Sequence, residues 1–75
     1  MSLRNALLEA IKKHAEGHIE KHRVNVENLL QNTVGVAEHP DHIETIEKEL
    51  GIIAEYDDQL EMLNKYFVKK DPFKK

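Results

Sequence analysis

The feature that most constrains the fold is an unbroken heptad pattern in the second half of the chain. Alternating steps of three and four residues join Ile43, Ile46, Leu50, Ile53, Asp57, Leu60, Asn64 and Phe67. Such steps place side chains along one face of an α-helix that packs in the manner of a coiled coil. The sequence therefore predicts a helix over about residues 41–67, whose apolar face needs a partner helix.

The first half of the chain can supply this partner. Residues 3–32 contain no proline and a single glycine, and apolar side chains recur on one side of the predicted helix: Leu7, Ile11, Ala15, Val26 and Leu29. The segment 33–40 contains Gly35 and Pro40, which are typical of a helix end and a helix start. Because this turn is short, the helices should be antiparallel neighbours. We expect an all-α fold, in which residues 1–75 form one helical hairpin with a basic tail at 68–75.

A chain of 75 residues without cysteine has few means of stabilising itself alone. A core of this size contributes only roughly 3–5 kcal/mol, and disulfides are excluded. The predicted hairpin would also leave apolar side chains on the shoulders of both helices, namely Leu8, Ile19, Leu30, Ile52, Tyr56 and Leu63. We therefore expect a homodimer in which two hairpins form a four-helix bundle.

Three histidines, His14, His18 and His22, lie four residues apart and share one side of the first predicted helix. Two histidines at this spacing can chelate a transition metal, but a useful site needs further ligands, for which Asp57 and Glu61 are the candidates. The Glu-x-x-His signature of bundle di-iron sites is missing. We therefore favour packed, hydrogen-bonded histidines and expect no cofactor, with a metal-binding bundle as the alternative.

The heptad pattern includes two polar residues, Asp57 and Asn64, which we interpret as determinants of register and oligomeric state. A simple antiparallel register places His18 opposite Asp57. A carboxylate inside a bundle is costly unless it is paired, and an imidazole is the nearest donor. We therefore predict a hydrogen-bonded pair of His18 and Asp57, within the hairpin or across the dimer.

The charge distribution argues against a general nucleic-acid binder. The formal net charge is −3, although the residues from Lys65 onward include five lysines and one aspartate. The body of the chain is thus acidic, and nucleic-acid contact through the lysine tail is a second alternative only. We find no apolar run long enough to span a membrane, no secretion signal and no nucleophile or phosphate-loop motif. These observations predict a cytoplasmic protein without enzymatic activity.

Three stretches carry a resemblance to a known group of proteins: residues 3–10 (LRNALLEA), 34–41 (VGVAEHPD) and 60–67 (LEMLNKYF). Together they resemble small conserved helical proteins of unassigned function from large tailed phages of marine cyanobacteria. The resemblance implies a phage protein in the host cytoplasm and brings no catalytic residue. With the residue patterns, it leads us to expect a small interaction or adaptor protein, whose protein partner the sequence does not name.

Overall fold

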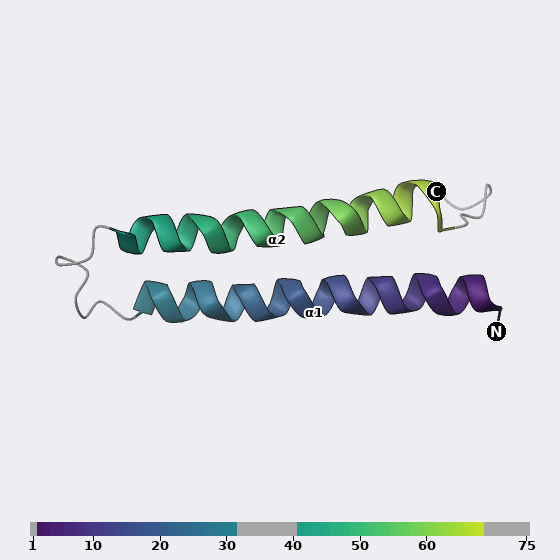
Figure 1. Ribbon diagram of the computed structural model, residues 1–75, viewed down its shortest axis with the longest axis horizontal. Coiled ribbons are helices and arrows are strands. Elements are labelled where there is room, and N and C mark those ends of the chain that lie inside the picture. The colour runs from purple at the N-terminus through teal and green to yellow at the C-terminus, as the bar shows by residue number, and fades with distance from the viewer. Residues whose placement is uncertain (1, 32–40, 69–75) are drawn as a thin grey trace, which may run out of the picture.

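The computed structural model describes residues 2–31 and 41–68, which form two helices that run antiparallel and side by side (Figure 1). Helix α1 spans Leu3–Gln31 and helix α2 spans Asp41–Tyr66. The all-α hairpin expected from the sequence is confirmed over these residues. The turn expected at 33–40 and residues 69–75 of the basic tail lie outside the described residues.

Each helix begins with residues suited to a helix N-terminus. The Asn5 backbone N–H donates to Ser2 Oγ over 3.0 Å, so Ser2 caps α1. The acidic residues Asp41 and Glu44 lie in the first turn of α2, and Lys65 lies in its last turn. These charges complement the helix dipole. The Ser2 cap was not predicted from the sequence.

The core of the hairpin is thin. Among the described residues only Ala15 is buried, with 1% of its surface exposed. Other α1 residues against α2 are half-buried: Leu8, His18, Ile19, His22, Asn25, Val26 and Leu29. A small residue at the centre of this row lets the two helices approach closely, but one buried alanine is little core for two long helices.

The half-buried residues of α2 correct the predicted heptad assignment. They are His42, Ile46, Glu49, Ile52, Ile53, Tyr56, Leu60, Met62 and Leu63. Three of the predicted heptad residues are exposed, namely Leu50, Asp57 and Asn64. In each case the residue one position earlier is half-buried instead, namely Glu49, Tyr56 and Leu63. The helix is rotated from the predicted orientation, and in the observed one Glu49 and Tyr56 face polar side chains of α1.

The C-terminal end of each helix is capped by a side chain from the other helix. Arg4 of α1 donates from Nη2 to the Phe67 carbonyl, just beyond α2, over 2.6 Å. His42 of α2 donates from Nε2 to the Leu29 carbonyl, in the last turn of α1, over 2.8 Å. The last four carbonyls of a helix have no partner within it, so these bonds satisfy groups that would otherwise depend on water. We call this pair of bonds the reciprocal caps.

Two glycines inside the helices offer a simple test of the fold. A Cβ atom at Gly17 or Gly51 would meet nothing within 4 Å apart from its chain neighbours and the local helix backbone. Glycine inside a helix is less favourable than alanine by about 0.5–1 kcal/mol. We expect Gly17→Ala and Gly51→Ala each to raise the free energy of unfolding by about that amount, measured by urea denaturation. A loss of stability in either variant would mean that another chain packs on that glycine.

Candidate functional site

The histidine row is the main concentration of polar chemistry on α1. His14 is exposed, whereas His18 and His22 are half-buried. The ring centroids of His14 and His18 are 4.5 Å apart in an edge-to-face arrangement, and those of His18 and His22 are 6.2 Å apart and stacked. The expectation of packed, hydrogen-bonded histidines is met by His22 alone, because His18 is half-buried without a hydrogen-bond partner among the described residues and His14 is exposed.

The partner of His18 within the hairpin is Tyr56 and not Asp57. The His18 and Tyr56 rings are stacked with centroids 4.6 Å apart and planes within 5°. Asp57 is exposed and forms no hydrogen bond or ion pair with the described residues. The predicted pairing of His18 with Asp57 is therefore wrong for the hairpin itself, since the rotation of α2 brings the preceding residue to this position. Pairing across a dimer stays a prediction.

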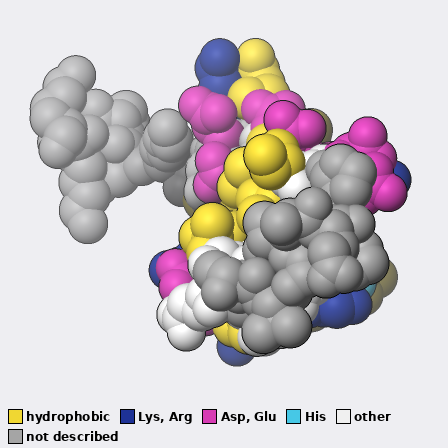
Figure 2. Space-filling model, turned by 90° about the vertical axis from the view of Figure 1, so that its left-hand side faces the viewer, with side chains coloured by type: hydrophobic (Ala, Val, Ile, Leu, Met, Phe, Trp, Pro, Cys, Tyr) yellow, Lys and Arg dark blue, Asp and Glu magenta, His cyan; other side chains and the backbone are white. Residues whose placement is uncertain are grey.

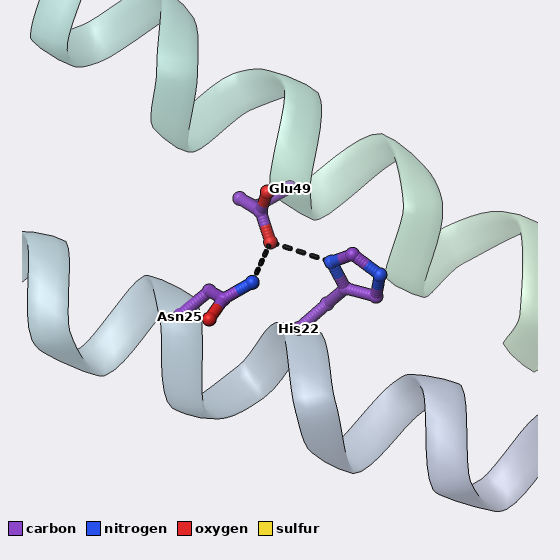
Figure 3. A network of polar contacts seen from close by, with 3 residues as sticks. All are labelled: His22, Asn25 and Glu49. Carbon is purple, nitrogen blue, oxygen red and sulfur yellow. Dashed lines mark hydrogen bonds and ion pairs between the residues drawn. The ribbon is translucent and has the colours of Figure 1, made fainter.

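The only hydrogen-bonded side-chain network between the two helices, within residues 2–31 and 41–68, joins His22, Asn25 and Glu49 (Figure 3). His22 donates from Nδ1 to Glu49 Oε1 over 2.6 Å, and Asn25 donates from Nδ2 to the same oxygen over 2.9 Å. The His22 and Glu49 side chains are only 12% and 18% exposed. The carboxylate thus fixes which ring nitrogen of His22 carries the proton.

The network controls the ionisation of Glu49. The bond from His22 is the largest influence and lowers the pKa of the Glu49 carboxyl, and the bond from Asn25 lowers it further, against an opposing effect of burial. The position of Glu49 between the helices was not predicted from the sequence, because the heptad pattern favours its apolar neighbour Leu50 at the interface. Polar residues on α1 at the facing positions, His22 and Asn25, were the available signal.

His18 is held toward its neutral form. Burial is the main cause that lowers the pKa of its imidazole, followed by the positive charges of His14, Lys21 and His22. Two lysines, Lys13 and Lys21, lie beside His14 and His18 on this side of α1, although the chain as a whole is acidic.

The alternative of a metal site at the histidine row needs at least three ligands that lie close together. Among the residues that the structure describes, no group of three or more His, Asp or Glu side chains is placed to hold a metal ion. Nδ1 of His22 is also engaged with Glu49. The arrangement therefore gives no support to the alternative of a metal site at His14, His18 and His22.

The hairpin has two sides, which flank the line of contact between the helices. At 100° per residue, Ala15, His22 and Leu29 lie along the contact line of α1. Leu8, Ile19, Val26 and Leu30 lie to one side of this line, together with Ile43, Leu50 and Ile53 of α2, and we call this the apolar side. The histidine side lies opposite and carries His14, His18 and Lys21 with Tyr56.

Apolar residues remain at the surface of the apolar side. Leu30 is 56% exposed, Leu50 50% and Ile43 67%. A hollow there is lined by four apolar residues, Val24, Val26, Leu50 and Ile53, and by three charged ones, Glu20, Arg23 and Glu27. Viewed from the turn end, hydrophobic side chains are visible at the surface among acidic ones (Figure 2).

The shoulder residues predicted to form one oligomer surface are divided between the two sides. Leu8, Ile19 and Leu30 lie on the apolar side, whereas Ile52, Tyr56 and Leu63 are half-buried on the histidine side. Tyr56 is engaged with His18. On the apolar side, the exposed apolar residues of α2 are therefore Ile43 and Leu50 and not the three that were predicted.

Comparison of the chain with protein-family models, with curated proteins and with solved structures found no match. Neither described helix combines the length and the apolar character needed to cross a membrane.

Proposed function

We propose that this chain is a small non-catalytic interaction protein that works as a homodimer, with two hairpins packed through their apolar sides into a four-helix bundle. The observation that carries the proposal is the imbalance between core and surface in the described residues. Only Ala15 is buried there, while leucine and isoleucine side chains on the apolar side remain half exposed or more. A second layer of helices would bury these side chains and provide the missing core.

A second copy fits this surface in size and chemistry. Two adjacent helices of this length present a side about 40 Å long and 20 Å wide. This matches the roughly 800 Å² that each partner buries in a standard interface. A two-fold dimer also requires one self-complementary patch, for which the exposed Leu30, Ile43 and Leu50 are the apolar candidates. We further propose, from the resemblance to phage proteins, that the dimer works as an adaptor in the host cytoplasm.

Sedimentation equilibrium of the full chain tests the dimer. Leucine burial contributes about 1.5–3 kcal/mol, and each substitution acts twice in a two-fold dimer. We expect Leu50→Gln to raise the dimer Kd by at least about 100-fold. Leu7→Gln is the matched control, because Leu7 is 54% exposed and lies away from the apolar side. Its Kd should stay within about threefold of the unaltered chain.

Two outcomes would contradict the proposal. A folded monomer of the unaltered chain at high micromolar concentration would exclude a working dimer. Equal weakening by Leu50→Gln and Leu7→Gln would place the interface elsewhere. Circular dichroism of both variants at the same concentration checks that each remains helical.

A further inference from the structure

We propose that the histidine side of α1 carries a binding site for a small tetrahedral oxyanion, such as a phosphate group. A shallow hollow on this side is lined by Lys13, His14, Gly17, His18 and Lys21. Four of these five residues carry a side-chain nitrogen that can bear a positive charge, and no carboxylate lines the hollow. This site is separate from the proposed dimer surface and does not depend on it.

Gly17 lies at the centre of this arrangement. On a helix surface, a residue is surrounded by those three and four positions away along the chain. Around Gly17 these positions include Lys13, His14 and Lys21. His18 follows Gly17 directly. Because Gly17 has no side chain, and a Cβ there would meet nothing within 4 Å apart from its chain neighbours and the local helix backbone, the floor of the hollow is open. An anion can therefore approach the helix surface between the cationic groups.

The positive groups of the hollow are poorly compensated within the described residues. The ion pairs among the described residues are Lys13–Glu9, His22–Glu49 and Arg23–Glu20. Lys21 takes part in none of these three pairs. The Lys13–Glu9 pair is 3.9 Å long and exposed, and it contributes little. An oxyanion would supply the negative charge that this side lacks.

The groups that face His18 make anion binding dependent on pH. On α1 these are His14, Lys21 and His22, which disfavour its protonation. From α2, Tyr56 stacks on the ring, and Glu49 is held by His22 and Asn25. A bound anion would favour the protonated imidazole and raise the pKa of His18. The affinity for the anion should therefore increase as pH falls through the pKa that His18 has in the anion-bound protein. It should become constant below the pKa that His18 has in the free protein.

Sulfate is a suitable probe, because its charge stays constant between pH 5 and pH 8. The ring protons of the histidines are followed by NMR over this range, with sulfate exchanged for chloride at constant ionic strength. We expect sulfate to raise the pKa of His18. If the rise is one unit, the affinity for sulfate should be about tenfold higher at pH 5 than at pH 8.

Substitutions locate the site. Lys21→Gln should weaken sulfate binding by about fivefold to tenfold, and Lys13→Gln should weaken it as well. Lys48→Gln is the matched control, since Lys48 is an exposed lysine of α2 that does not line the hollow. Its affinity for sulfate should stay within about twofold of the unaltered chain. All variants remove one positive charge, so a general effect of net charge would appear equally in each.

Three outcomes would overturn the proposal: no change in the His18 pKa between sulfate and chloride, no increase in affinity at low pH, or equal weakening by Lys48→Gln and Lys21→Gln. Inorganic phosphate and glycerol phosphate, compared at one pH, then identify the source of the ligand. Equal affinity for the two supports a site for the free ion, and tighter binding of glycerol phosphate supports a phosphorylated small molecule.

Discussion

Replacing Ala15 with leucine should lower the free energy of unfolding by about 1–3 kcal/mol. Ala15 is 1% exposed and lies on the contact line of α1, where its small side chain lets the helices approach closely. A leucine there adds three carbon atoms to a packed contact, so the helices must move apart or the new side chain must take a strained rotamer. Urea denaturation at a fixed protein concentration measures the change.

Ala10→Leu is the control for this prediction, because Ala10 lies on the same helix but is exposed. Leucine and alanine have similar helix propensities, so this variant should change stability by less than about 0.5 kcal/mol. If the two variants behave alike, the contact at Ala15 is loose and the helices do not pack as described.

The second large effect is expected at the His22–Glu49 pair. His22→Leu should lower the Tm by about 5–10 °C, because it leaves a largely buried carboxylate with only Asn25 as a donor. Glu49→Leu leaves the donors of His22 and Asn25 unsatisfied and should lower the Tm by a similar amount. The double variant should recover much of the loss, since a leucine pair needs no hydrogen bond. If the two single losses simply add, the residues are not coupled.

The pH dependence of this coupling follows from the ionisation of Glu49. Since the pKa of the folded carboxyl is lowered, the pair contributes its full stability above the unfolded glutamate pKa of about 4.5. The contribution is lost as pH falls through the lower pKa of the folded state. The double-mutant cycle should therefore give a clear coupling at pH 7 and a much smaller one near pH 3. An equal coupling at both values would show that the charge of Glu49 plays no part.

The helices were predictable because they depend on local patterns that one sequence displays in full. Periodic apolar residues and the stop signals near Gly35 and Pro40 predicted the two helices and their antiparallel packing. Their relative rotation was not predictable in the same way, because it depends on pairs of residues from both helices. Hydrophobicity favours Leu50 over Glu49, whereas the donors on His22 and Asn25 favour Glu49.

The candidate site was predictable only in part, because some of its contacts depend on the relative rotation of the two helices. The histidine row follows from spacing alone, whereas the partner of His18 depends on the rotation of α2 and changes from Asp57 to Tyr56. His42 gives a second example. In the sequence it lies beside a turn, where a histidine is usually at the surface, yet it is half-buried and bound to the Leu29 carbonyl.

The reciprocal caps set a condition on how this hairpin can change in length. Leu29 lies 25 residues after Arg4, and Phe67 lies 25 residues after His42, so the two helices advance equally between the capped ends. An insertion in one helix alone would move one donor away from its carbonyl. A matched insertion of seven residues in each helix would keep both caps and both faces. Longer or shorter versions of this hairpin should therefore differ by whole heptads in both helices together.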